Sequence, residues 1–243
     1  MNRPIALFVL LTAFPLAALA DGPSDYVFTP DVTYGEHEID FKAGGWKRKD
    51  EDQPKSAASI GYGYGVTQRW FTEFYGKYER GDATHFDAFE WENKFALTEP
   101  GEYLFDTGLI VEVERPKDRS EGYELLFGPL FQTEVGKVQL NGNLLFGRHY
   151  RADVVPPMQF SYQWQAKYRW RPQFEFGLQG FGELGQWNHW DPAEQRSHRI
   201  GPAVFGKLSL GNHQALRYNA AWLARASTNA ADQNFRVQVE YEF

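Results

Sequence analysis

The chain has 243 residues, no cysteine and a formal net charge of −7 at pH 7. The acidic balance argues against nucleic acid as a partner, because binding nucleic acid requires a basic face. Without cysteine there is neither a disulfide framework nor a thiolate metal site.

The first 20 residues are predicted to be a cleaved secretory signal peptide. Arg3 supplies the positive start, an apolar run covers 4–17, and Ala18-Leu19-Ala20 is a small-x-small cleavage site before Asp21. The run is too short for a spanning helix. A buried N-terminal helix is the alternative, but nothing here alternates at helical period. Cleavage removes one positive charge and no acid, which changes the net charge from −7 to −8.

Residues 21–35 follow the cleavage site and contain Pro23 and Pro30. They either hang free in the periplasm or fold into the barrel as a plug. Because the segment is small for a plug, we expect a flexible or wall-hugging periplasmic segment. The remaining domain is then 36–243.

From residue 36 to the end, apolar and polar residues alternate with a period of two. Successive side chains of a strand point to opposite faces, so each segment separates an apolar from a polar environment. Segments of about ten residues fit tilted strands that cross a bilayer. We predict twelve strands, at 36–46, 57–66, 70–79, 86–97, 102–114, 122–132, 137–150, 158–170, 174–186, 198–209, 215–225 and 234–243.

The predicted connections alternate in length, as in barrels with short periplasmic turns and longer outer loops. Five are short: Thr67–Arg69, Thr98–Gly101, Thr133–Gly136, Arg171–Gln173 and Leu210–Gln214. Six are longer: Lys47–Ser56, Arg80–His85, Arg115–Glu121, Arg151–Pro157, Trp187–Ser197 and Ala226–Gln233. An even strand count places both termini in the periplasm.

A soluble β-sandwich also alternates, but its strands are usually shorter, at about five or six residues. Aromatic residues make up 17% of this chain, which suits the aromatic girdles of a membrane barrel. The last strand ends on Phe243, and this resembles the signal that outer-membrane barrels present to their assembly machinery. The predicted fold is therefore all-β, a closed antiparallel up-and-down transmembrane β-barrel of about 12 strands.

The junction from Gly61 to Trp70, Gly-Tyr-Gly-Tyr-Gly-Val-Thr-Gln-Arg-Trp, resembles those of small proteobacterial outer-membrane barrels. The Gly-Pro pairs at 128–129 and 201–202 are similar to theirs. These barrels include the group associated with aromatic-compound transport in the phenol meta-pathway. The resemblance implies passage of small solutes and transfers no functional residue.

The sequence gives little support for an enzyme. Barrel lipases and deacylases need Ser and His on one strand face, and none of the six histidines has a serine two residues away. Ser197 and His198 are adjacent, so on a strand they point apart. One outer loop contains His189 and Asp191, which could belong to a catalytic site at the rim of the barrel or could bind a metal. Two ligands alone do not make a metal site. We predict no catalytic residue, no metal and no cofactor.

Inward-facing charges are predicted to line two opposed walls of the lumen, as in the constriction of general porins. The acidic wall consists of Glu92, Asp106, Glu112 and Glu124. Placing each strand at mid-membrane predicts a polar central belt of the lumen that includes Glu92, Asp106, Gln165 and Gln179. The basic wall consists of Arg199, Arg217 and Arg236. Their expected role is to set charge selectivity, with a mild preference for cations or neutral polar solutes.

We therefore expect a narrow, porin-like passive channel for small polar solutes in the outer membrane of a Gram-negative cell. The alternative is a non-conducting structural or interaction barrel with a salt-bridged lumen, since twelve strands enclose a narrow space. Expected partners are outer-membrane lipid and lipopolysaccharide, the barrel-assembly machinery through the strand ending in Phe243, and small solutes.

Overall fold

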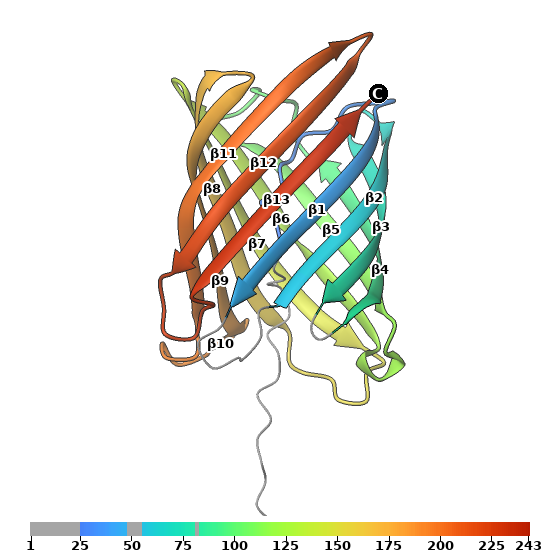
Figure 1. The fold of residues 1–243 in the computed structure, drawn as a ribbon, viewed down its shortest axis with the longest axis vertical. Helices are drawn as coiled ribbons and strands as arrows, with labels where there is room; N and C mark the ends of the chain where they lie inside the picture. Colours follow the sequence, from blue (N-terminus) through green and yellow to red (C-terminus); the bar gives the residue numbers. More distant parts are fainter. Residues whose placement is uncertain (1–24, 48–54, 81–82) are drawn as a thin grey trace, which may run out of the picture.

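The computed structural model describes residues 25–47, 55–80 and 83–243. Over these ranges the protein is a closed antiparallel β-barrel of 12 strands, drawn in Figure 1. A two-residue strand, β10 (His189–Trp190), extends the outer hairpin of β9. The barrel strands are β1 (His37–Lys47), β2 (Lys55–Thr67), β3 (Trp70–Arg80), β4 (Thr84–Ala96), β5 (Asp106–Pro116), β6 (Tyr123–Val135), β7 (Val138–Tyr150), β8 (Gln159–Arg171), β9 (Phe174–Gln186), β11 (Ser197–Gly211), β12 (Gln214–Arg225) and β13 (Gln233–Glu242).

Each strand pairs with its neighbours in the chain, and β13 pairs with β1 to close the barrel. At this seam the backbone N–H of Phe243 donates to the carbonyl of His37 at 2.9 Å, and the N–H of His37 donates to the carbonyl of Phe243 at 3.1 Å. Closure satisfies the backbone groups of both edges, which have no water partner in lipid.

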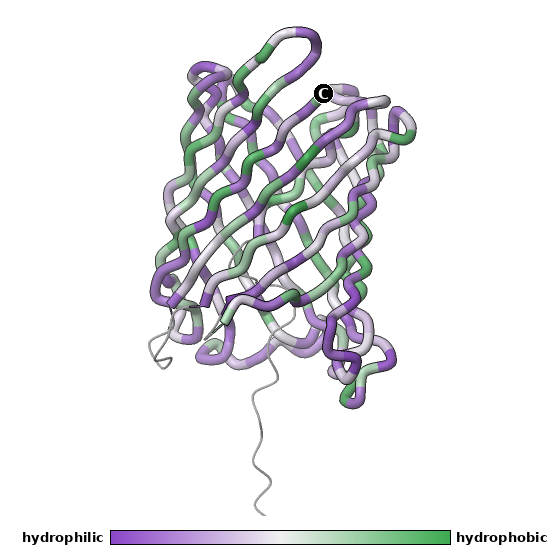
Figure 2. Tube along the Cα trace, turned by 45° about the vertical axis from the view of Figure 1, so that its right-hand side comes forward, coloured by the Kyte–Doolittle hydropathy of each residue, from purple (hydrophilic) through white to green (hydrophobic). Residues whose placement is uncertain are grey.

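Buried and more exposed side chains alternate along the barrel strands. In Figure 2, hydrophilic and hydrophobic colours likewise alternate along much of the barrel. On β3, Glu73 is only 3% exposed, whereas its neighbour Phe74 is 59% exposed on the outside. Ile60 and Phe89 are similarly exposed outward. This outer apolar surface is the one that a bilayer covers.

One predicted strand begins later than expected. The pattern predicted a strand over 102–114, but β5 begins at Asp106. Gly101 has a positive φ of 75°, and its N–H donates to a carboxylate oxygen of Asp106 at 2.6 Å. The turn therefore continues through the exposed apolar residues Tyr103, Leu104 and Phe105, whose composition resembles a strand.

The described parts of the outer loops contain little regular structure. A 3₁₀ helix, Arg119–Glu121, follows β5, and the Asp118 carboxylate accepts from the N–H and the hydroxyl of Ser120. These hydrogen bonds hold the pKa of Asp118 below its usual range. None of the residues that the structure describes lies in a helix long and apolar enough to cross a membrane. The predicted signal peptide, 1–20, and most of the loop at Lys47–Ser56 lie outside the described residues.

Candidate functional site: the lumen of the barrel

The described start of the chain lies inside the barrel. The backbone carbonyl of Phe28 accepts from the side chain of Asn143 at 3.1 Å, and Asp31 accepts from Gln132 at 3.1 Å. At the end of the segment, the N–H of Gly35 donates to the carbonyl of Gly65 at 2.8 Å, next to the start of β1. The sequence placed 21–35 on the periplasmic side of the barrel. Its described part runs instead from the middle of the lumen to the rim.

Val27 and Phe28 anchor this segment to two different walls. Adjacent residues of an extended chain point in opposite directions, and here each inserts into its own apolar cluster. Val27 packs with Phe181, Ala203, Phe205, Ala221 and Leu223. Phe28 packs with Ile110, Leu126, Leu130 and Leu145. Burying a Phe or Val side chain stabilises by about 1.5–3 kcal/mol, so these contacts hold the segment across the lumen.

Tyr26 attaches the same segment to the polar wall. Its hydroxyl donates to Glu92 at 2.6 Å. The ammonium of Lys42 lies between two rings, 3.6 Å from the centre of Tyr26 and 3.7 Å from that of Tyr75. Asp40, fully buried, accepts from the Tyr75 hydroxyl at 2.8 Å and lies 3.4 Å from the Lys42 ammonium. Tyr26, Val27 and Phe28 therefore fill the middle of the lumen, and we call residues 25–33 the plug.

A cavity of about 1010 Å³ opens between the plug and the barrel end that carries the C-terminus. Tyr26, Val27 and Thr29 line its inner end, and Arg171 and Pro172 belong to the turn at its mouth. In the topology expected for such barrels this is the periplasmic end. The lumen therefore contains a solvent-accessible vestibule that ends at the plug.

One wall carries a continuous acidic stripe. The strand registers align Glu38 with Gly63, Gly63 with Glu73, Glu73 with Glu92 and Glu92 with Glu112. A parallel row contains Glu240, Asp40, Gly61, Tyr75, Glu90, Glu114 and Glu124. The stripe thus runs from the vestibule rim on β13 and β1 to the outer end of β6.

Three of the four residues of the predicted acidic wall, Glu92, Glu112 and Glu124, lie on this stripe. Asp106 does not lie at mid-membrane as expected. It is the first residue of β5, at the mouth of the vestibule, where its carboxylate binds the N–H of Gly101.

The three predicted arginines lie on the neighbouring strands β11, β12 and β13, at different depths of the lumen. Arg236 is buried and donates to Gln179 at 2.9 Å and to Asn219 at 3.2 Å. Arg199 is buried against the rings of Trp46 and Phe181.

Arg217 lines the vestibule, where it forms an ion pair with Glu242. Arg199 and Arg236 therefore lie in the outer half of the lumen, and Arg217 lies in the periplasmic half.

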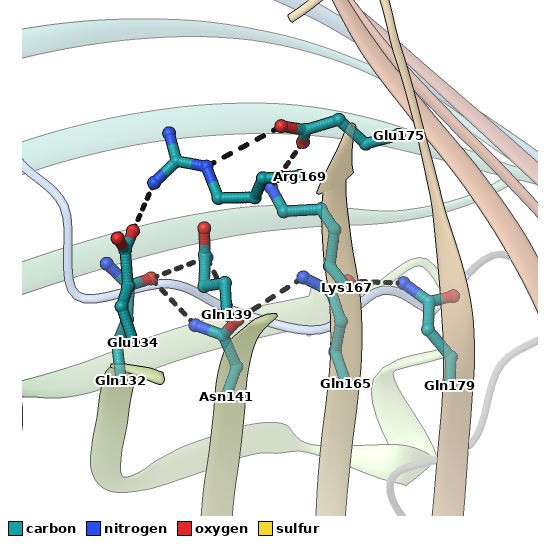
Figure 3. A network of polar contacts seen from close by, with 9 residues as sticks. All are labelled: Gln132, Glu134, Gln139, Asn141, Gln165, Lys167, Arg169, Glu175 and Gln179. Carbon is teal, nitrogen blue, oxygen red and sulfur yellow. Dashed lines mark hydrogen bonds and ion pairs between the residues drawn. The ribbon is translucent and has the colours of Figure 1, made fainter. Parts of the chain in front are cut away.

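Opposite the acidic stripe, neutral amides form a hydrogen-bonded ladder across four strands, shown in Figure 3. Gln179 donates to Gln165 at 2.7 Å, Gln165 donates to Asn141 at 3.3 Å, and Asn141 donates to Gln132 at 2.8 Å. The sequence placed Gln165 and Gln179 in the polar belt of the lumen but missed Gln132 and Asn141. Their alternation with Phe131 and Leu140 was the available signal.

An ion-pair cluster lies beside the ladder in the same view (Figure 3). Arg169 pairs with Glu134 and lies 3.5 Å from Glu175, which is 3.2 Å from Lys167. The charges on this wall are thus matched, unlike those of the acidic stripe.

The residues considered for a rim enzyme are not brought together as a catalytic pair. Ser197 is buried on the lumen side of β11, whereas His198 lies beside the hydroxyl of the outward-facing Tyr162, 2.9 Å away. His189 is exposed in the outer hairpin, and the backbone N–H of Asp191 donates to Leu184.

A closed barrel with an apolar outer surface and a polar lumen defines a transmembrane β-barrel of the outer-membrane type. Solved structures support this class. The NanC porin matches with a TM-score of 0.57 and 10% identity, over 84% of this chain and all of its own. An outer membrane channel from Pseudomonas putida F1 matches with a TM-score of 0.55 and 13% identity, over 92% of this chain and 99% of its own.

The KdgM porin, solved in complex with disordered oligogalacturonate, matches with a TM-score of 0.52 and 12% identity over 85% of this chain and 99% of its own. No model of a protein family matches the chain, and no curated protein matches it. At these identities the likeness shows the fold.

Proposed function

We propose that the protein is an outer-membrane channel for small polar solutes, exported by the signal peptide 1–20 and inserted as the barrel 36–243. The observation that carries this proposal is the acidic stripe, which offers charged groups from the vestibule to the outer end of the lumen. A structural core would pair its buried charges, and this stripe contains more carboxylates than cations. The shared fold with porins supports the same function.

The charged residues of the lumen set its selectivity in this proposal. Glu92, Glu112 and Glu124 favour cations and neutral polar solutes along the stripe. Arg199 and Arg236 act in the outer half, and Arg217 and Asp106 act in the vestibule.

Conduction requires the plug to leave the middle of the lumen, because Tyr26, Val27 and Phe28 fill it. The plug is joined to β1 through Gly35, which has a positive φ of 77°. It belongs to no strand, so its departure breaks no pairing of the barrel.

The test is single-channel conductance in a planar bilayer. We compare the refolded mature chain, 21–243, with a chain that begins at Tyr34 and lacks the plug. We expect rare or small steps from the mature chain and larger, stable steps from the shortened one. Heat-shifted gel mobility must show that both chains are folded. The absence of conductance steps from both folded chains would contradict the proposed channel function.

The filled middle of the lumen favours one alternative function, a non-conducting barrel that presents its outer loops. The same experiment separates the two functions, because only a channel conducts once the plug is removed. In either case the expected surroundings are lipid and lipopolysaccharide, and the strand ending in Phe243 would bind the assembly machinery. We infer no enzymatic activity, and the resemblance to barrels of aromatic-compound degradation suggests one class of solute to assay.

A further inference from the structure

Three carboxylates gather where β13 meets β1. Glu38 and Asp40 come from β1, and Glu240 comes from β13, opposite Asp40 in the register. Each offers one oxygen, and the three oxygens lie within 4.8 Å of one another. All three residues line the vestibule, so an ion in the vestibule can reach them.

Two buried carboxylates at this place have an oxygen without a hydrogen-bond partner among the described residues. Asp40 is fully buried, and its Oδ1 has no partner, although its Oδ2 binds Tyr75 and Gln238. Glu73 is 3% exposed, lines the same vestibule, and its Oε1 also has none. Buried polar atoms in folded proteins are nearly always paired, and a lone buried carboxylate oxygen is costly. Both oxygens are therefore free to accept a ligand that supplies positive charge.

The charged groups around the cluster leave an excess of negative charge. Around the cluster lie four carboxylates, those of Glu38, Asp40, Glu73 and Glu240. The neighbouring ammonium groups are those of Lys42, 3.4 Å from Asp40, and Lys94, which lines the same vestibule.

Two more cations close to the cluster, Arg217 and Lys207, share the single carboxylate of Glu242. With Glu242 included, five carboxylates face four cations, so the cluster retains an excess of negative charge that a bound cation would offset.

We propose that Glu38, Asp40 and Glu240 bind one calcium ion from the vestibule. Calcium takes carboxylate oxygens at about 2.3–2.6 Å, so two ligands of one ion lie no more than about 5 Å apart. The three oxygens satisfy this limit. Magnesium requires shorter and more regular coordination. Glu73 adds negative charge at the site, and solvent in the vestibule completes the coordination shell.

The experiment is a calorimetric titration of calcium chloride into the refolded mature chain in detergent. We expect saturable binding of one ion per chain, and Glu240→Gln and Glu38→Gln should each weaken it by about tenfold or more. Both positions are only partly buried, so both variants should fold. The matched control is Glu134→Gln, another vestibule carboxylate, which pairs with Arg169 outside the cluster and should bind calcium as the parent does.

Three results would overturn the site: no heat of binding from the folded parent, equal loss in Glu134→Gln, or tighter binding of magnesium chloride than of calcium chloride. The titration does not require conduction. If the protein binds calcium but does not conduct in bilayers, the calcium site is supported and the channel function is contradicted. If it conducts but binds no calcium, the channel function is supported and the calcium site is contradicted.

Discussion

At the scale of single residues, carboxylates that look equivalent in the sequence lie in different environments of the lumen. Glu92 and Asp106 were both expected at mid-membrane. Glu92 lies on the stripe, 1% exposed, whereas Asp106 caps a turn at the mouth. A charge at a wide, solvated mouth is screened over about 8–10 Å at physiological salt. A buried charge at a constriction is screened far less.

We therefore expect Glu92→Gln to reduce the cation preference of the channel and Asp106→Asn to leave it nearly unchanged. Reversal potentials in a salt gradient, measured on the chain that begins at Tyr34, provide the test. Equal reversal potentials for the parent and Glu92→Gln would show that the stripe does not set selectivity.

A glycine provides the space for one ring of the lumen. A Cβ added at Gly61 would lie 2.4 Å from the ring of Tyr75, which donates to Asp40. Gly61→Ala must displace this ring, and overpacking of this kind costs about 1–3 kcal/mol. We expect a lower midpoint in urea unfolding. The control is Gly142→Ala, where an added Cβ meets nothing within 4 Å. Equal midpoints for the two variants would contradict the packing argument.

At the scale of elements, the strands were predictable and the plug was not. Each strand carries its own period-two pattern, and pairing between neighbours preserves it. The side-chain hydrogen bonds of the plug join residues 66 to 135 positions apart, as between Tyr26 and Glu92 or Phe28 and Gln163. No local pattern encodes such contacts. The available signal was the apolar triplet Tyr26-Val27-Phe28 in an otherwise polar segment.

The position of the plug can be tested by thiol labelling, since the native chain has no cysteine. Both residues border the vestibule, but Val27 is only 7% exposed within its apolar cluster, whereas Thr29 is only partly buried. We expect Val27→Cys to react slowly with a membrane-impermeant maleimide and Thr29→Cys to react quickly. Equal, fast reaction of both folded variants would show that the plug does not reside in the lumen.

At the scale of the whole molecule, the fold was predictable because a membrane leaves few alternatives. Alternation, short and long connections in turn, and an even strand count all indicated a closed barrel, and the structure confirms it. The distribution of charge within the lumen was harder to predict. It depends on the register between strands, and a shift of one residue exchanges the two faces. The side chain of Arg236 donates to the amides of Gln179 and Asn219.

The strands of the barrel are steeply tilted (Figure 1). A row of residues in register runs at right angles to its strands, and strands of such barrels tilt by about 35–45°. The row of Glu38, Glu73, Glu92 and Glu112 therefore climbs the wall as a helical ramp. An ion that moves from one carboxylate to the next would circle the axis about as far as it advances, and would cross the membrane by a spiral path.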